Sequence, residues 1–591
     1  IFFAWVAFII AISLSAQEKL LLENEVLKAE FDAKNGSLVH FVNKQTGWEI
    51  VNRASLGQSF ELLMPLTDKD LRFNVVKGID QKNPVIEQLP DKITFTWEGM
   101  RSELMDAEEN VIFRGEVVLT PAGLEFGGEI TNHGKYPVEY VSWPFLGEVT
   151  VPDKGQPLYH STRSDTRELF PHFFNEHGYW GVDYPTSTYP LPERSYVLVN
   201  NREQGFIVYG RKCLPNNLLI TSFELIPGFE ISNTNPADDM MDGQPVRIQF
   251  KANQIMYNKP GEKTTLNPVK ISLYKGSWNA GVDCYIKEKN NATPHMPGWI
   301  KDPLTWQKVS VENGDELVQY ARESLKCGVD VLQVRGWYRE VNGKIAEAPG
   351  LKDAIETCQE LGVKIVLETN WYSANAKSQT DANEIKRMAV KDPFGFPYDR
   401  SLLCPLSEYI EKKTIELWTK LPSLLAADGY INTDNNHRNK SYLCFSNQHG
   451  HKPGEPTANG TMVLDREMAE ILKSHGEKAA MGFGFLDQQS AYYDGYQISG
   501  SVSDFAKHRY MNSSTAITLP VDVKNARNDI NQAIKNRFNV NYDLQFFSTR
   551  LSDYPHVVLY GQQVEDFRKR YQESVWNAEF MDTKGAVVEG K

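Results

Sequence analysis

One acidic residue stands at the end of a short apolar run. Residues 428–436 read DGYINTDNN, and the run brings Asp434 to the end of what we expect to be a buried strand. Amides and bases follow at once, among them Asn435, His437 and Arg438. A carboxylate held in this way can attack an anomeric carbon or activate water. The amides can orient the acid and bind hydroxyl groups, so we predict that Asp434 is catalytic.

Other polar and aromatic residues stand at the ends of further apolar runs. They are Arg335, Trp337 and Tyr338 after one run, Glu368, Asn370 and Trp371 after the next, and Asp487 and Asp494 after two later runs. Glycoside hydrolysis needs two carboxyl groups, one as nucleophile or base and one as proton donor. Tryptophan rings can form walls for a pyranose, and Arg335, His437 and Arg438 suit anionic groups such as sulfate or uronate. The set therefore predicts a carbohydrate-binding site with hydrolytic chemistry.

From about residue 300 onwards, apolar runs alternate with amphipathic helical patterns. The runs cover residues 304–311, 329–338, 363–373, 428–436, 477–487 and 493–501. This alternation is typical of parallel βα units. No GxGxxG or P-loop motif is present, which favours a (β/α)8 barrel, with its chemistry at the carboxyl ends of the strands. We expect the last two strands within residues 538–550 and 556–561.

The part of the chain before the barrel has the pattern of short antiparallel strands. Apolar and polar residues alternate, and Asn35-Gly36 is a strong signal for a two-residue hairpin turn. Within this β region, residues 159–190 are too polar and aromatic for a strand and too long for a hairpin loop. The segment either packs on its own sandwich or, as we hypothesise, reaches over the pocket of the neighbouring domain.

Composition and the two termini limit the possible partners and location. The 591 residues carry a net charge of −13 without a basic stripe, which argues against nucleic acid as a partner. Residues 1–16 have the pattern of a signal peptide cleaved before Gln17, and the run is short for a membrane span. We expect a secreted or periplasmic protein without a stable span. Residues 581–591 look like the start of a further β domain that is cut short.

Cysteine and histidine residues raise the question of a metal. The six cysteines are widely spaced and form no CxxC pair, which argues against a zinc ribbon. His437, His449 and His451 lie near Cys444, and a His-x-His pair can bind metal. The sequence HGHKPG is, however, typical of a tight loop whose histidines bond to their neighbours. We therefore expect no metal and no cofactor.

Several longer stretches resemble known enzymes. The opening NEVLKAEFDAKNGSLVHFVNKQTG and the later LCPLSEYIEKK, DGYINTDNN and LCFSNQHGHKPG resemble secreted bacterial glycoside hydrolases of families 129 and 101, and more distantly family 36 α-galactosidases. The resemblance implies a galactose-mutarotase-like β-supersandwich at residues 17–295, followed by a (β/α)8 catalytic barrel at residues 296–580. It also implies retaining, exo-acting hydrolysis of α-linked galactose, N-acetylgalactosamine or 3,6-anhydro-galactose.

The resemblance assigns roles to two acids and reveals one departure. The family nucleophile is an Asp after the fourth strand, which corresponds to Asp434. The acid/base is usually a Glu near the end of the next strand, but residues 482–496 contain no Glu. Asp487 is the nearest replacement and Asp494 the second, with Glu368 as an outside candidate. Because of this departure, an alternative function stays open: the protein is a non-catalytic, glycan-binding pseudo-enzyme of a polysaccharide-utilisation system.

Overall fold

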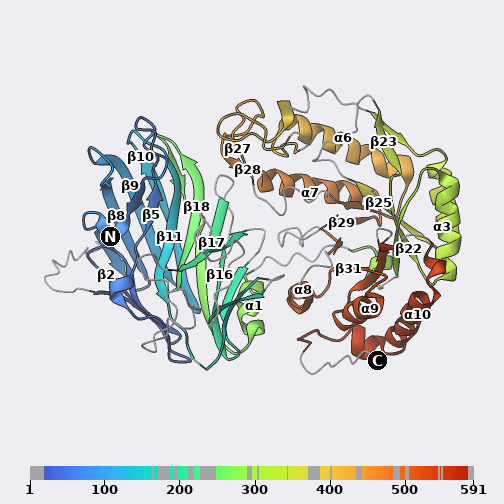
Figure 1. Cartoon of the computed structure of the whole chain (residues 1–591), viewed down its shortest axis with the longest axis horizontal. Coiled ribbons are helices and arrows are strands. Elements are labelled where there is room, and N and C mark those ends of the chain that lie inside the picture. Colours follow the sequence, from blue (N-terminus) through green and yellow to red (C-terminus); the bar gives the residue numbers. More distant parts are fainter. Residues whose placement is uncertain are drawn as a thin grey trace, which may run out of the picture. The chain divides into compact units, whose positions relative to one another are not determined.

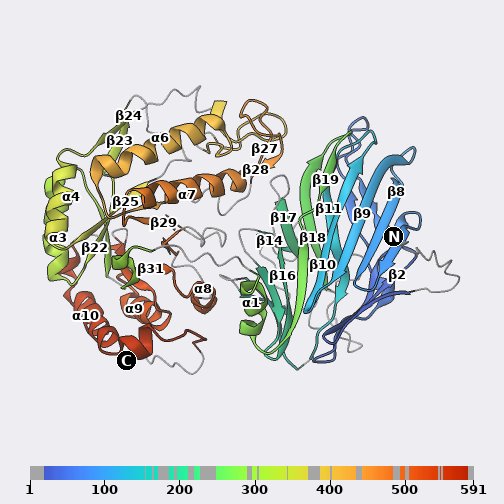
Figure 2. The ribbon, with the colours of Figure 1, turned by 180° about the vertical axis from the view of Figure 1, so that it is seen from behind.

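The chain folds into two compact units. The computed structural model describes residues 19–153, 155–162, 166–170, 186–191, 196–210, 218–225, 248–288, 296–302, 305–341, 344–369, 387–399, 402–433, 442–483, 493–498, 505–543, 546–547 and 550–583. The first unit is built from the described residues within 1–156, 170–187 and 222–274. The second is built from those within 157–169, 188–221 and 275–591. Figures 1 and 2 show both units from opposite sides.

The first unit consists of antiparallel sheets. One sheet has the order β1 (Lys19–Glu23), β2 (Leu27–Asp32), β3 (Leu38–Asn43) and β4 (Trp48–Val51). A second contains β20 (Val269–Lys275), β10 (Gly123–Asn132), β9 (Glu109–Leu119), β8 (Lys92–Met100) and β7 (Val85–Leu89) in that order, with β19 (Lys263–Thr265) paired to β10. A third contains β18 (Ile248–Asn258), β11 (Val138–Val149), β5 (Glu61–Leu63) and β6 (Val75–Lys77). The predicted hairpin is present between β2 and β3, but residues 33–37 separate the two strands, so its turn is longer than the two residues expected. Gly36 takes φ = 72° within this turn.

Buried aromatic rings form the core between two of these sheets. Trp97 on β8 stacks on Phe113 of β9, with ring centroids 5.4 Å apart. Trp143 on β11, in the facing sheet, meets both rings edge-on at 6.3 and 5.7 Å. Edge-to-face and stacked pairs of this kind stabilise a core beyond the area that they bury. Part of the aromatic content of the chain therefore serves the sandwich rather than sugar binding.

The second unit contains a closed barrel of parallel strands. Its strands, in barrel order, are β21 (Trp306–Ser310), β22 (Val331–Arg335), β25 (Lys364–Thr369), β26 (Gly429–Asn432), β29 (Ala479–Phe483), β30 (Gly495–Gln497), β31 (Ala516–Val521) and β32 (Asn539–Asp543). Each strand is parallel to its neighbours, and β32 closes the barrel by pairing with β21. The predicted combination of an N-terminal antiparallel sandwich and a parallel barrel is confirmed.

Helices follow most barrel strands and cover the outside of the barrel (Figures 1 and 2). They are α3 (Gly314–Lys326), α4 (Leu351–Glu360), α6 (Glu408–Leu425), α7 (Thr457–Ser474), α8 (Phe505–Met511), α9 (Ala526–Lys535) and α10 (Pro555–Arg570), with the short α2 (Gly298–Lys301) before β21. The residues at the start of α3 explain why the helix begins there. Asn313 Oδ1 accepts a 3.0 Å hydrogen bond from Glu316 N and caps the helix. No helix in the described ranges is long and apolar enough to cross a membrane.

The prediction for the last two strands was half right. Residues 539–543 form β32, inside the expected range, but residues 556–561 lie in α10 and not in a strand. Pro555 occupies the first turn of α10, where its missing N–H costs nothing. The seventh strand is instead β31, a fully buried run that contains Pro520. A proline usually argues against a central strand, which is why the sequence pattern concealed it.

Smaller elements complete the second unit. They are β12 (Leu158–Ser161), β13 (Thr166–Phe170), β15 (Tyr196–Asn200), β16 (Gln204–Gly210) and α1 (Trp278–Ile286), and the hairpins β23 (Tyr338–Val341) with β24 (Lys344–Glu347) and β27 (Leu443–Cys444) with β28 (Glu455–Pro456). The chain also forms β14 (Thr186–Leu191) and β17 (Leu218–Leu225). Tyr285 of α1 packs against Tyr196 and Tyr209, each at 5.5 Å between ring centroids, which joins α1 to β15 and β16.

Candidate active site

The barrel strands alternate between residues that face the surrounding helices and residues that face the barrel interior. Leu332, Val334 and Tyr430 share a buried cluster with residues of α3, α4, α6 and α7. Trp306 and Ile431 lie on strands that are not neighbours, yet they meet in a separate buried cluster with residues of four other strands. Residues of distant strands can meet in this way only inside the barrel. The interior is therefore apolar at the level of Trp306.

Farther along the strands, the inward positions become polar. Lys308 lies two residues after Trp306 on β21, and its Nζ is 2.8 Å from Oε1 of Glu368 on β25. The same Nζ is 3.8 Å from Oδ2 of Asp543, the last residue of β32. The side chains of Lys308 and Glu368 are each 11% exposed and that of Asp543 is 2% exposed. Two largely buried carboxylates thus share one cation near the carboxyl ends of their strands.

Amide side chains extend this group across the barrel. Gln333 on β22 donates from Nε2 to Oε1 of Glu368 at 2.6 Å and to Oε1 of Gln497 on β30 at 2.9 Å. Asn541 on β32 donates from Nδ2 to Oε1 of Gln333 at 2.9 Å. We call these six side chains the interior polar network: Lys308, Gln333, Glu368, Gln497, Asn541 and Asp543. Because the network links five strands, it holds its charged members in fixed positions.

The strand that leads to Asp434 is fastened at its carboxyl end. Thr433, directly after β26, donates from its backbone N and from Oγ1 to the carbonyl of Thr369, at 2.8 and 3.0 Å. Thr369 returns a 3.1 Å bond from Oγ1 to the carbonyl of Ile431. On the outer face, Asn432 donates to Oδ1 of Asp465 on α7 at 2.9 Å. The residue before Asp434 is therefore held against the end of β25, the strand of Glu368.

The structure brings some of the predicted rim residues to this end of the barrel. Glu368 belongs to the interior polar network, and Arg335 is the exposed last residue of β22. Tyr338 is half-buried at the start of β23, with its ring 4.5 Å from that of Trp337. Glu368 contacts both Lys308 and Gln333, an arrangement that suits binding and positioning better than transfer of a proton.

The structure corrects the role predicted for Trp337. The side chain is 0% exposed and packs in the core between the strands and the outer helices. Its Nε1 donates a 2.7 Å hydrogen bond to the carbonyl of Glu368. A ring enclosed on both faces cannot form the wall of an open sugar site. Trp337 instead supports the backbone of Glu368 from outside the barrel.

Asp494 also lies elsewhere than predicted. It directly precedes β30 and is therefore at the amino end of that strand, opposite to the rim. The side chain is 0% exposed, and its Oδ2 accepts a 2.9 Å hydrogen bond from the backbone N of Ala480. Its Oδ1 is 3.9 Å from Nζ of Lys473 on α7. The strand begins at Gly495, directly after Asp494, so that Gln497 and not Asp494 is at its carboxyl end.

The remaining predicted site residues fall outside the described part of the chain. They are Asp434, Asp487, Asn370, Trp371, Asn435, His437 and Arg438. The assignment of the nucleophile and of the proton donor therefore stays a prediction. The same holds for the signal peptide at residues 1–16 and for most of residues 581–591.

The sequence analysis missed most of the interior polar network. Lys308, Asn541 and Asp543 stand within runs that are otherwise apolar or half-apolar, WQKVS and NVNYD. Polar residues at every second position of a buried barrel strand indicate a polar face, because such positions point to the same side of the strand. Lys308 is in the middle of β21 and not at its end, so the positions at strand ends do not reveal it.

The described parts of residues 159–190 belong almost entirely to the strands β12, β13 and β14, so the expectation that this segment is unsuited to strands was wrong. The hypothesis that it reaches over a pocket is addressed by one contact near its beginning. Nζ of Lys507, on the helix α8 that follows β30, donates a 3.0 Å hydrogen bond to Oγ1 of Thr166 on β13. Lys507 also lies over the ring of Trp278 on α1, at 5.8 Å. The first part of the segment thus contacts the helix that follows the sixth barrel strand. Residues 171–185 lie outside the described residues.

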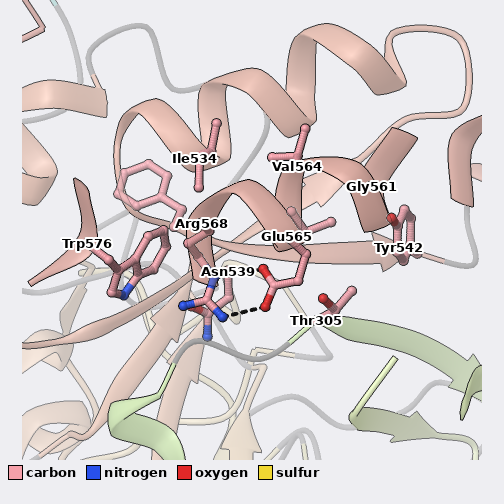
Figure 3. A pocket seen from close by; sticks show the side chains of 11 residues that line it. Thr305, Ile534, Asn539, Tyr542, Gly561, Val564, Glu565, Arg568 and Trp576 are labelled. Carbon is pink, nitrogen blue, oxygen red and sulfur yellow. Dashed lines mark hydrogen bonds and ion pairs between the residues drawn. The ribbon is translucent and has the colours of Figure 1, made fainter. Parts of the chain in front are cut away.

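A small pocket opens between the end of the chain and the barrel (Figure 3). Arg568 on α10 is 5% exposed, donates from Nε to Glu565 at 2.7 Å, and lies over the ring of Trp576 at 5.1 Å. Thr305 and Asn539, which also line the pocket, are at the amino ends of β21 and β32. The pocket is therefore at the opposite end of the strands from the interior polar network, and its ion pair is already satisfied.

The structure brings together four residues that can bind a metal. Ligand atoms of Cys404, Cys444, His449 and His451 all lie within 4.8 Å of one another. The sequence analysis grouped His449 and His451 with Cys444 and expected the histidines to bond to their loop neighbours. His451 does bond to its neighbour Lys452, but His449 bonds to the carbonyl of Arg387, which is far away in the sequence. In both rings the other nitrogen faces a thiol. Cys404 is 40 residues before Cys444 in the sequence, so the pattern offered no sign of the fourth member.

Comparisons by sequence found no relatives. No family model matches the chain, and no curated protein matches it.

Comparisons by structure found many similar proteins. The α-N-acetylgalactosaminidase NagBb from Bifidobacterium bifidum, solved in complex with GalNAc, aligns with a TM-score of 0.63 at 10% identity, over 92% of each chain. The GH36 α-galactosidase AgaA from Geobacillus stearothermophilus aligns with a TM-score of 0.53 at 11% identity, over 95% of this chain and 87% of that one. AgaB from the same organism gives 0.53 at 10% identity, over 93% and 85%. The chain thus shares its fold with solved GH36 α-galactosidases and an α-N-acetylgalactosaminidase.

Proposed function

We propose that the protein is a retaining, exo-acting α-glycosidase that removes α-linked galactose-type sugars from the ends of glycans. The observation that carries the proposal is the interior polar network at the carboxyl ends of the barrel strands. A barrel needs no such group for its stability, since apolar side chains fill the same space at the level of Trp306. Charged side chains at this end of a barrel are typical of an active site.

The network offers the contacts that a sugar ring requires. Lys308 can donate hydrogen bonds, while Glu368 and Asp543 can only accept them when ionised. Donors and acceptors that alternate at fixed positions can distinguish axial from equatorial hydroxyl groups. The solved neighbours support galactose-type sugars, because their structures contain raffinose in AgaA and GalNAc in NagBb.

Asp434 is the proposed nucleophile. It follows Thr433, whose backbone and side chain are bonded to the end of β25. In a retaining mechanism the carboxylate attacks the anomeric carbon, while a second carboxyl group about 5–5.5 Å away protonates the leaving oxygen. We propose Asp487 for that second role. It later removes a proton from the water that releases the sugar.

Exo action is proposed on narrower grounds. The contact between Thr166 and Lys507 brings the start of the 159–190 segment to the helix after β30. A site bordered by such a segment would accept a chain end in preference to the middle of a polymer. Oligosaccharides labelled at the reducing end should therefore lose single sugars from the non-reducing end.

The test is sugar release from α-galactosyl, α-N-acetylgalactosaminyl and carrageenan or agar oligosaccharides. We expect release from at least one panel member and a loss of about 10³-fold or more in kcat for Asp434→Asn. Asp428→Asn is the matched control, because Asp428 precedes the same strand at its opposite end. Proton NMR of the first product should show the α-anomer.

Two outcomes would contradict the proposal. If Asp434→Asn retains the parental rate, Asp434 is not the nucleophile. If no panel member is cleaved but one binds equally well to the parent and to Asp434→Asn, the protein is a glycan-binding pseudo-enzyme.

A further inference from the structure

We propose that Cys404, Cys444, His449 and His451 form a structural Zn²⁺ site in the long segment between β25 and α7. The two cysteines are supplied by separate stretches of chain. Cys404 lies shortly before α6, next to Leu403, which forms an isolated bridge with Ala389. Cys444 ends β27, and the two histidines follow in the turn that leads to β28. We refer to these four residues as the Cys2His2 cluster.

The distances within the cluster fit tetrahedral coordination. Sγ of Cys404 is 3.4 Å from Nε2 of His451, and Sγ of Cys444 is 3.5 Å from Nδ1 of His449. Zinc binds sulfur at about 2.3 Å and nitrogen at about 2.0–2.1 Å, so two tetrahedral ligands of these types are separated by about 3.5 Å. All four ligand atoms lie within 4.8 Å of one another, so one ion can reach all of them.

Hydrogen bonds fix both imidazoles in the form that binds a metal. Nε2 of His449 is 2.8 Å from the carbonyl of Arg387, and Nδ1 of His451 is 2.9 Å from the carbonyl of Lys452. A carbonyl oxygen only accepts, so in each ring the nitrogen that faces the carbonyl carries the proton. The other nitrogen then directs its lone pair toward a cysteine. Metal-bound histidines are usually held by such a second bond.

Burial and ligand type indicate which metal would bind. Cys404 and Cys444 are 0% exposed and His449 is 2% exposed. Two thiols with two imidazoles select zinc over calcium or magnesium, which require oxygen ligands. Because four protein ligands leave no position for water or substrate, the site is structural rather than catalytic.

The cluster would hold a specific part of the barrel rim. It ties the turn between β27 and β28 to the segment before α6. Backbone bonds follow the same path: Phe445 N donates to Lys391 at 3.0 Å, and Glu408 N donates to His449 at 3.3 Å. Tyr442, just before β27, is only eight residues after Asp434. An ion here would thus fix the far end of the segment that begins at the proposed nucleophile.

The first experiment measures metal in the full chain, purified without chelators and without a histidine tag. We expect about one zinc per chain by plasma mass spectrometry. Replacement of zinc by Co²⁺ should give the visible absorption bands and the near-ultraviolet thiolate band of tetrahedral sulfur coordination. Removal of the ion with a chelator should lower the Tm and release two reactive thiols.

Variants then assign the ligands. Cys444→Ser and His451→Ala should each retain less than about one fifth of the zinc, because loss of one ligand of four weakens binding strongly. Cys358→Ser is the matched control, since Cys358 is a buried free thiol on α4 outside the cluster. It should retain full zinc content.

The wild-type protein alone can overturn the proposal, even where a variant fails to fold. Metal well below one ion per chain, together with no cobalt bands, would exclude the site. A mass 2 Da lower under non-reducing conditions, with Cys404 and Cys444 in one cross-linked peptide, would show a disulfide in its place. The result is independent of the proposed function, because it is measured without any substrate.

Discussion

The two ends of the barrel use the same residue types for different purposes. At the amino ends, Asp428 precedes β26 and Asp494 precedes β30, and each accepts a hydrogen bond from a backbone N of the preceding barrel strand. The acceptor distances are 3.0 Å to Ile365 N and 2.9 Å to Ala480 N. At the carboxyl ends, Glu368 instead meets Lys308 inside the barrel. The position of an acid along its strand, and not its type, decides whether it bonds to the backbone of a neighbouring strand or enters the interior polar network.

The difference follows from what surrounds each end. The interior near the amino ends is filled by an apolar cluster that includes Trp306, and α2 adds Ile300 to it. Acids there lie beside the strands and satisfy free backbone groups, which would otherwise be buried without a partner. Near the carboxyl ends, the described residues that meet in the interior are those of the interior polar network, and their charged side chains contact one another. Substitutions at four positions test this difference between the two ends.

The largest effect is expected for Lys308→Met. Glu368 and Asp543 would then lose the cation that they share, and loss of one partner of a buried ion pair typically costs about 3–5 kcal/mol. We also expect kcat/KM to fall about 100-fold for folded protein, because the sugar contacts lose their position. Chemical denaturation and initial rates measure the two effects separately.

Lys364→Met provides the control for that substitution. Lys364 Nζ is 2.9 Å from Asp428 at the amino end, but its side chain is 38% exposed and Asp428 keeps two further partners. A pair of this kind contributes only about 0.2–1 kcal/mol, and activity should be unchanged. Equal effects of the two substitutions on stability and on activity would show that the ion pair in the barrel interior is no more important than the one at the amino end.

An intermediate effect is expected for Asp494→Ala. The substitution leaves the backbone N–H of Ala480 without its acceptor, which costs about 1–3 kcal/mol for a buried donor. Asp494→Asn keeps an oxygen for that bond and should recover most of the stability. Thermal unfolding measures both variants. If the Asp494→Asn variant is folded but its kcat/KM is more than about tenfold below that of the wild type, Asp494 has a binding or catalytic role after all.

The smallest effect is expected for Asp330→Asn, and it depends on pH. Burial raises the pKa of Asp330, at the amino end of β22, above its ordinary value of 3.8. The folded state therefore binds the proton more tightly than the unfolded state, and stability falls as pH rises from 3.8 through the raised pKa. The Asn variant lacks this loss, so its relative stability should increase across that window and then stay constant. Unfolding curves between pH 4 and about 8 test this, and a difference that does not change with pH would refute it.

The sequence predicted the architecture because its signals are local. The alternation of apolar runs and amphipathic helices over residues 304–501 specified the βα units, and the confirmed barrel contains six strands in those ranges. The seventh strand was missed and the eighth helix misassigned, since Pro520 and the apolar start of α10 contradict the usual signals. The hydrophobic pattern indicates which residues are buried, but it indicates less reliably whether those residues belong to a strand or to a helix.

The candidate site was predicted only in part, for a different reason. Glu368 was found from its place at the end of an apolar run, whereas Trp337, from the preceding predicted set, is a core residue. A single tryptophan after a strand has the same appearance in the sequence whether it faces a ligand or a helix. The fold of the backbone around Gly336, which takes φ = 74°, turns Trp337 outward from the barrel.

The amino-acid sequence was sufficient to predict the two-part fold, the barrel and an acid shortly after its fourth strand. It could do so because these features depend on short-range periodicity and on the order of elements. Only the tertiary structure brought Lys308, Glu368 and Asp543 together from three strands, and Cys404 to Cys444 and the two histidines. Such groups depend on contacts between residues 40 to 235 positions apart. Closure of the barrel and pairing of its loops create them, and no local pattern encodes that geometry.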